Sequence, residues 1–225
     1  MKLNERPAFR IERLTPSSSA DFLRFFDHES GPAFADNPEW AKCYCHYYEV
    51  PVAISWPTFD GAANRAAMGE RIASGEMEGF LAYADRGPAA ASGDKSGAQL
   101  GAQLGAQVVG WLNAQPYHKL QHACARLSIA APPLPVPAHD AAAIVCFVTA
   151  PAWRRRGVAR ALLDGALANF AARGITLVDA FPWNVGPDDT AATDHYHGSP
   201  SLFAAAGFVA IATHDNVTVV RRMLR

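Results

Sequence analysis

FVTAPAWRRRGVARALL, residues 147–163, is the stretch of this sequence that decides the fold. The residues that lead into it, 141–149, form a continuous apolar and β-branched run, which is typical of a strand buried on both faces. A polar turn follows and ends at Gly157. Residues 158–173 then predict a helix, because one face collects Val158, Leu162, Leu163, Ala166, Leu167 and Phe170. The stretch therefore predicts a central strand, a tight turn and a helix.

The turn before this helix has the features of an anion site. A helix N-terminus presents unpaired backbone N–H groups and the positive end of the helix dipole, so main chain alone can hold a diphosphate. Gly157 lets the backbone approach the phosphates, and Ala159 keeps the first turn uncrowded. The spacing is neither G-x-G-x-x-G nor a P-loop with its Lys-Ser/Thr, which disfavours NTP hydrolysis.

These residues resemble the acetyl-CoA signature of the GNAT-type N-acetyltransferase superfamily, whose Q/R-x-x-G-x-G/A core is matched by Arg154, Gly157 and Ala159. The likeness continues through residues 175–181 and into SLFAAAGF, residues 201–208, which is similar to the family's closing helix and Gly-Phe entry to the sixth strand. It implies a single α/β domain over residues 1–225, in which helices flank a twisted mixed sheet of about seven strands.

The resemblance also implies acetyl-CoA as the cosubstrate, bound between two splayed central strands. The pantetheine arm would pair with the backbone of residues 147–149, and the pyrophosphate would lie on the amides of residues 155–160. The cofactor-binding residues implied in this way are Phe147, Val148, Thr149, Arg154, Arg155, Arg156, Gly157, Val158, Ala159 and Arg160.

Attack of a neutral amine on a thioester needs a proton acceptor, an N–H at the developing oxyanion and an acid for the thiolate. A backbone N–H near Val148 is the oxyanion candidate. The family often has a tyrosine where this chain has Phe203, so Tyr196 in the preceding loop is the candidate acid, with unassisted departure of the thiolate as the alternative. Asp179 and His118 are the candidate bases, and a chain of water molecules is the alternative to both.

Because this chain has Phe203 where the family often has a tyrosine, a second function stays open. A chain with the same fold that binds acyl-CoA without turnover would act as a sensor. We therefore weigh two hypotheses, an N-acetyltransferase acting on a primary amine and a non-catalytic acyl-CoA-binding protein.

The composition and net charge of the chain limit the classes of molecule that it is expected to bind. Hydrophobic residues make up 50% and charged residues 18% of the 225 residues, which excludes disorder for the bulk of the chain. A net charge of −1, from 20 basic and 21 acidic residues, gives no reason to expect nucleic acid or an anionic membrane. The longest apolar run, residues 141–153, is too short to span a bilayer, and the first residues do not resemble a secretory signal. We expect a cytoplasmic enzyme with a small-molecule acceptor, either monomeric or a homodimer.

Four cysteines without a C-x-x-C pair predict reduced thiols. Cys43 and Cys45 would point to opposite faces of an extended chain, and no second ligand pair follows at a zinc spacing, so we expect no metal. The nearby aromatic residues either line the acceptor side or pack in the core; they are Trp40, Tyr44, Tyr47 and Tyr48.

The remaining pattern predicts a strand within residues 7–15, helices at 22–26 and 62–73, and a final hairpin of strands 208–213 and 217–223. Two further strands at 79–84 and 107–113 flank a GAQL repeat, so residues 86–107 read as a flexible hairpin tip. Four prolines make residues 132–137 a stiff connector.

Overall fold

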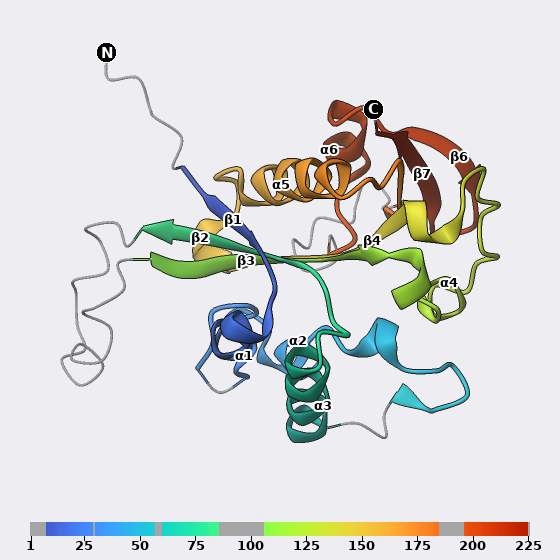
Figure 1. Cartoon of the computed structure of the whole chain (residues 1–225). Coiled ribbons are helices and arrows are strands. Elements are labelled where there is room, and N and C mark those ends of the chain that lie inside the picture. The colour runs from blue at the N-terminus through green and yellow to red at the C-terminus, as the bar shows by residue number, and fades with distance from the viewer. Residues whose placement is uncertain (1–7, 29, 57–59, 86–105, 185–195, 225) are drawn as a thin grey trace, which may run out of the picture.

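The computed structural model describes residues 8–28, 30–56, 60–85, 106–184 and 196–224. Its centre is a seven-stranded sheet of order β1-β2-β3-β4-β5-β7-β6, in which only β4 and β5 pair in parallel (Figure 1). The strands are β1 (Arg10–Arg13), β2 (Phe80–Asp85), β3 (Ala106–Pro116), β4 (Ala141–Thr149), β5 (Leu177–Ala180), β6 (Val209–Thr213) and β7 (Thr218–Met223). This arrangement confirms the mixed, helix-flanked sheet that the sequence predicts.

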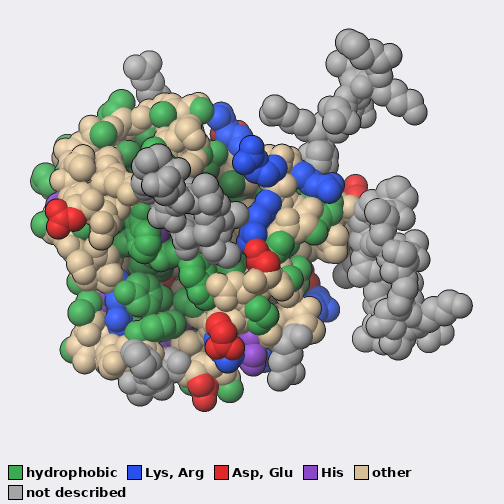
Figure 2. Space-filling view, turned by 180° about the vertical axis from the view of Figure 1, so that it is seen from behind, with side chains coloured by type: hydrophobic (Ala, Val, Ile, Leu, Met, Phe, Trp, Pro, Cys, Tyr) green, Lys and Arg blue, Asp and Glu red, His purple; other side chains and the backbone are tan. Residues whose placement is uncertain are grey.

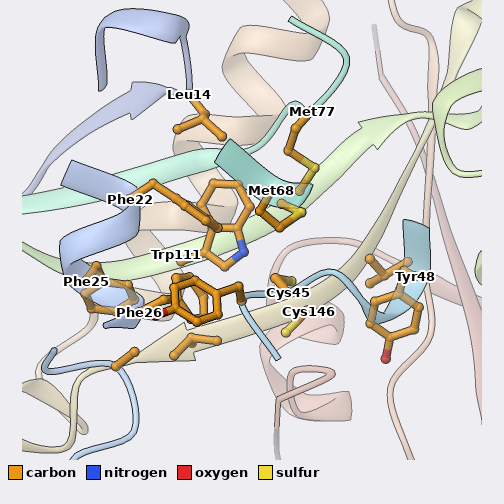
Figure 3. Close-up of a cluster of buried hydrophobic side chains, with 14 of the residues drawn as sticks. Leu14, Phe22, Phe25, Phe26, Cys45, Tyr48, Met68, Met77, Trp111 and Cys146 are labelled. Carbon is orange, nitrogen blue, oxygen red and sulfur yellow. The ribbon is translucent and has the colours of Figure 1, made fainter. Parts of the chain in front are cut away.

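Helices cover both faces of the sheet. The longest is α5 (Val158–Ala172), which lies across one face, while α1 (Ser19–Phe26) and α3 (Gly61–Ala73) lie against the other (Figure 1). The shorter helices are α2 (Pro38–Ala41), α4 (Ala123–Arg126) and α6 (Pro200–Ala205). In the α1 layer Phe22 packs edge to face on Trp111 of β3, with ring centroids 4.9 Å apart (Figure 3).

The core on the α5 side of the sheet is built by the apolar stripe of this helix. Its residues Leu162, Leu163, Ala166 and Phe170 are fully buried against β2, β3 and β4, and Phe170 packs edge to face on Phe80 at 5.6 Å. Since this stripe fixes the helix on the sheet, it also fixes where the helix N-terminus lies, next to the end of β4.

The two central strands separate along β4. The parallel pairing joins residues 141–144 of β4 to residues 177–180 of β5 and goes no further. The pairing of β4 with β3, in contrast, continues to Thr149. The last residues of β4 therefore have one edge in the sheet and one edge facing a gap, as the sequence resemblance implied for the cofactor cleft.

Most predicted elements are confirmed, and the differences lie at their ends. The strand at 141–149 is observed over those residues, and the helix predicted at 158–173 ends one residue earlier. The predicted hairpin tip is wrong at its end, because Ala106 and Gln107 already pair with β2. The rest of that tip, residues 86–105, lies outside the described residues. Residues 132–137 form neither helix nor strand, as their prolines predict.

Within the described ranges, no helix has the length and apolar character needed to cross a membrane.

Candidate active site

The N-terminus of α5 is shaped by left-handed backbone. Gly157 caps the helix at φ +94°, and Arg155 two residues earlier has φ +62°. The first hydrogen bond of the helix joins Ala161 N to Gly157 O at 3.0 Å. The N–H groups of residues 158–160 precede that bond, and the first N–H groups of a helix lack intrahelical acceptors. They are therefore placed to bind an anion, and the anion site predicted from the sequence stays a prediction.

A cavity of about 560 Å³ opens at this helix end. Its walls include nine of the ten residues that the sequence nominates for cofactor binding: Phe147, Val148, Thr149, Arg154, Arg155, Gly157, Val158, Ala159 and Arg160. Arg156 is not among the lining residues, and its guanidinium lies over the ring of Trp153 at 5.5 Å. We call this space the cofactor cavity. The face seen in Figure 2 has hydrophobic side chains gathered in its hollow and a row of Lys and Arg side chains beside it.

The backbone of β4 offers only part of its polar groups to this cavity. Ala150 donates from N to Val109 O at 3.0 Å, and antiparallel pairing alternates in direction, so the N–H of Val148 faces β3. The N–H groups of Phe147 and Thr149 face the gap. Phe147 donates its N–H to Tyr196 O at 2.5 Å. The N–H group left free on this edge of β4 is that of Thr149. It follows Val148, near which the sequence analysis expected the N–H that stabilises the oxyanion.

The arginines at the helix end differ in their intramolecular partners. Arg154 donates to both carboxylate oxygens of Asp36, at 2.5 and 3.2 Å, and this contact holds the pKa of Asp36 below its ordinary value. Arg160 donates to Asp164 at 2.7 Å. Arg155 lines the cavity and has no side-chain hydrogen bond or ion pair to any described residue. Its charge is therefore the one most available to a phosphate.

Tyr196 lines both the cofactor cavity and a second cavity described below, and its ring packs against aromatic neighbours. Its ring meets that of Trp40 edge to face, with centroids 5.6 Å apart. Two residues later Gly198 has φ +78°, and a Cβ there would come within 2.8 Å of Phe203 and 3.1 Å of Phe147. Phe203, at the family's tyrosine position, is fully buried. The structure thus brings Tyr196, but not Phe203, to the cavity wall.

His197, to which the sequence argument gave no role beside Tyr196, lines neither cavity but packs against Tyr196, with ring centroids 4.4 Å apart. Its Nε2 lies 3.1 Å from the hydroxyl of Tyr48, and its ring stacks on Trp183 with centroids 4.8 Å apart. Burial lowers the pKa of His197 to about 3, so the imidazole is neutral near pH 7. Adjacency to Tyr196 is the only sequence signal that could have pointed to it.

Asp179 is held away from the candidate acid. This fully buried carboxylate accepts hydrogen bonds from Arg221 of β7 at 2.7 and 2.8 Å and from the hydroxyl of Tyr117 at 2.6 Å. It lines neither the cofactor cavity nor the adjacent one, and the same holds for His118. The structure therefore does not bring either base candidate together with Tyr196.

A second cavity, of about 410 Å³, adjoins the first, and we call it the acceptor cavity after the expectation that the aromatic residues at 40–48 line the acceptor side. The two share Phe34, Val148 and Tyr196 in their walls. Of the aromatic residues at 40–48, Trp40, Tyr47 and Tyr48 line it. Tyr44 instead lies in the core, with its hydroxyl 3.2 Å from Nδ1 of His28. Three of these aromatic residues thus line a cavity and Tyr44 packs in the core, and that the cavity takes the acceptor stays a prediction.

Three thiols line the acceptor cavity: Cys43, Cys45 and Cys146. The expectation that Cys43 and Cys45 point to opposite faces is wrong, because Tyr44 and Cys45 have φ +46° and +55° and the chain turns there instead of extending. Burial raises the pKa of Cys43 to about 12. Cys45 lies beside Cys146 (Figure 3) and accepts a hydrogen bond from Asn113 at 3.5 Å. No group of three metal-ligating His, Cys, Asp or Glu side chains occurs among the described residues.

Hydrogen-bond donors around Cys45 and the burial of its thiol have opposite effects on the pKa of that thiol. Burial alone raises the pKa of this thiol, but hydrogen bonds from neighbours that include Cys146 and Asn113 bring the pKa below its ordinary value. For Cys146, donation to Cys45 and burial both raise the pKa. Sulfur that accepts hydrogen bonds thus lies in the wall of the acceptor cavity.

Comparison with known proteins places these cavities in a family context. Residues 62–198 match the model of the acetyltransferase (GNAT) family, which is more than half of the chain. The fold is similar to a GCN5-related N-acetyltransferase from Kribbella flavida, with 17% identity, 96% of this chain and 98% of that chain covered, and a TM-score of 0.50. An N-acetyltransferase from Staphylococcus aureus Mu50 aligns at 12% identity over 97% of this chain and 99% of that chain, with a TM-score of 0.48.

A third solved structure, the PaiA N-acetyltransferase from Thermoplasma acidophilum in complex with coenzyme A, aligns at 10% identity over 96% of this chain and 99% of that chain, with a TM-score of 0.46. No curated protein sequence gives a significant match.

Proposed function

Because the chain belongs to the GNAT acetyltransferase family, we propose that it transfers the acetyl group of acetyl-CoA to the primary amine of a small molecule. The observation that carries this proposal is the junction of two cavities, one at the N-terminus of α5 and one lined by apolar side chains. Val148 and Tyr196 belong to both walls, so a thioester placed between them would be open to an amine from the other side.

The residues of the cofactor cavity fit the parts of acetyl-CoA. The free N–H groups at the start of α5 suit the pyrophosphate, and Arg155 adds a positive charge that no described partner neutralises. The pantetheine arm would pair with the gap-facing edge of β4 by donating to the carbonyls of Phe147 and Thr149, which leaves Thr149 N–H for the oxyanion. Phe147 N–H is not available for this, because it already donates to Tyr196 O.

Bond changes at the junction follow from this placement. The lone pair of the neutral amine attacks the thioester carbon, and the oxyanion that forms would be stabilised by Thr149 N–H. The C–S bond then breaks, and Tyr196 would give its hydroxyl proton to the departing thiolate. The proton lost by the amine would leave through water, since Asp179 and His118 line neither cavity.

Release of CoA thiol from acetyl-CoA in the presence of an amine panel tests the proposal, with mass spectrometry of the acetylated product. We expect amine-dependent thiol release. The rival hypothesis, an acyl-CoA sensor, is favoured by the missing hydroxyl at Phe203 and expects stabilisation by acetyl-CoA without turnover. Absence of both stabilisation and turnover would contradict both hypotheses.

A further inference from the structure

The acceptor cavity has an unusually aromatic wall, and this wall bears on which amines the proposed transferase accepts. Half of its fourteen described lining residues are aromatic: Phe26, Phe34, Trp40, Tyr47, Tyr48, Trp56 and Tyr196. Several of these rings contact one another, and Tyr47 meets Trp56 edge to face with centroids 5.2 Å apart. Such a wall offers ring faces and edges on which an aromatic ligand can pack.

The charged groups of this wall are already paired. Glu39 and Lys42 are the two charged residues among the described lining residues, and Lys42 Nζ lies 2.8 and 2.9 Å from the two carboxylate oxygens of Glu39. A carboxylate on the acceptor would compete with Glu39 for Lys42, and a second ammonium would compete with Lys42 for Glu39. Both side chains are exposed, by 42% for Lys42 and 75% for Glu39, so a charge buried among the rings would find no buried counter-charge in the described wall.

Neutral polar groups of the wall are also engaged: Tyr47 donates its hydroxyl to Arg126 O at 3.3 Å, and the hydroxyl of Tyr48 lies 3.1 Å from His197 Nε2. Asn64 donates from Nδ2 to Lys42 O at 2.9 Å, and its Oδ1 lies 2.9 Å from Nδ1 of His46. A sugar or other polyhydroxylated acceptor would therefore leave its own hydroxyl groups poorly satisfied. Burying an unpaired polar or charged group costs binding free energy, whereas an apolar ring gains it.

The orientation of an acceptor follows from the residues that the two cavities share. Its amine must reach the junction at Val148 and Tyr196, because the acetyl group would arrive from the cofactor cavity. Cys146 precedes Val148 by two residues on β4, so both side chains face the same side of the sheet. Tyr47 and Trp56 line the acceptor cavity but not the cofactor cavity. They are thus placed to pack on the part of the acceptor remote from its amine.

We infer that the acceptor is an arylalkylamine, an apolar aromatic molecule with a single primary amine and no carboxylate. This inference rests on the proposed function, because it takes the junction as the place of transfer. The aromatic end would lie among the rings of Tyr47 and Trp56, and the amine would lie beside Val148 and Tyr196, which line both cavities. Amino acids, polyamines and aminosugars are disfavoured by the paired charges and the committed amide.

A matched panel of amines tests the inference on the full chain. The probes are 2-phenylethylamine, L-phenylalanine, 1,4-diaminobutane, glucosamine and n-butylamine, each assayed by thiol release at saturating acetyl-CoA. We expect kcat/KM for 2-phenylethylamine to exceed that for each other probe by about tenfold or more. A higher value for phenylalanine, the diamine or the aminosugar would overturn the inference while leaving the proposed acetyl transfer intact.

Binding without turnover provides the second measurement. Calorimetric titration of 2-phenylethylamine into the chain, with and without CoA, should show saturable binding that Trp56→Leu weakens by about tenfold. Val52→Ala is the control, because Val52 lies in the same segment and is exposed. Trp40→Leu is a second wall variant should Trp56→Leu fail to fold. No binding of 2-phenylethylamine, or equal binding to parent and both wall variants, would overturn the inference even if acetyl-CoA stabilises the protein.

Discussion

The sharpest test of the cofactor cavity exchanges Gly157 for two residues of the same shape. Asn and Asp tolerate positive φ better than most side chains, and a Cβ at Gly157 would have no heavy atom of another residue within 4 Å. Both variants should therefore fold, with a loss of about 1–2 kcal/mol for the left-handed backbone. They differ by one negative charge at the place proposed for the pyrophosphate.

The expected magnitude follows from that charge. Two like charges 4 Å apart repel by about 4 kcal/mol at an effective dielectric constant of 20, and partial screening leaves enough to weaken CoA binding by about a hundredfold, which is about 2.7 kcal/mol. At a CoA concentration a hundred times the parent's Kd, ligand stabilisation is about 2.7 kcal/mol for the parent and falls to about 0.4 kcal/mol for Gly157→Asp. The Gly157→Asn variant should keep most of the parent's stabilisation by CoA.

Urea unfolding of the three proteins, each with and without CoA, measures these differences directly. Comparing each variant with itself removes the cost of the strained backbone, which is the same with and without ligand. Equal CoA stabilisation of Gly157→Asp and Gly157→Asn would refute the placement of the pyrophosphate at α5.

Other consequences of the structure can be measured separately. Tyr196→Phe should lower kcat by about 10²- to 10⁴-fold and remove the alkaline limb of the pH profile while the Kd for CoA barely moves; an unchanged kcat would show that the thiolate leaves without this acid. Arg155→Gln should raise the Kd for CoA more than Arg154→Gln, whose guanidinium is bound to Asp36, and isothermal titration that finds the reverse order would contradict the assignment. Asp179→Asn should destabilise the chain by about 3–5 kcal/mol by unbalancing a buried ion pair, yet leave kcat of the folded enzyme near the parent value. His197 has a folded-state pKa below its unfolded value, so its contribution to stability is present above about pH 6.5 and is lost as pH falls towards 3. Urea unfolding of His197→Gln should accordingly show a shallower loss of stability between pH 7 and 5 than the parent, and identical slopes would argue against a buried neutral imidazole.

The sequence predicts the strand, turn and helix around the cofactor cavity well because their determinants are local. The apolar run of β4 and the periodic stripe of α5 are each contiguous, and Gly157 lies where the turn between them must adopt positive φ. Hydrophobic periodicity and turn chemistry therefore suffice to place the helix N-terminus beside the strand.

The parts that sequence could not place depend on contacts between distant residues. Asp179 looked available as a base, but Arg221 lies 42 positions further along the chain and is brought beside it only by the pairing of β5 with β7. Cys43 and Cys45 looked divergent because the argument assumed extended backbone, whereas the turn at Tyr44 and Cys45 sends both thiols into one cavity. Neither strand partners nor left-handed non-glycine residues are written in the local pattern.

The contrast between contiguous and distant determinants also explains why family membership indicates the cosubstrate better than the acceptor. The family match covers residues 62–198, which include β4, the turn at Gly157 and all of α5. Most of the acceptor wall, including Trp40 and Trp56, comes from residues 26–56, before that match begins. If the proposed function holds, selectivity for the amine would therefore be encoded in a segment that the family model does not constrain. Replacing the rings of this segment should change the preferred amine without changing CoA affinity, since the cofactor cavity shares only Phe34 with it.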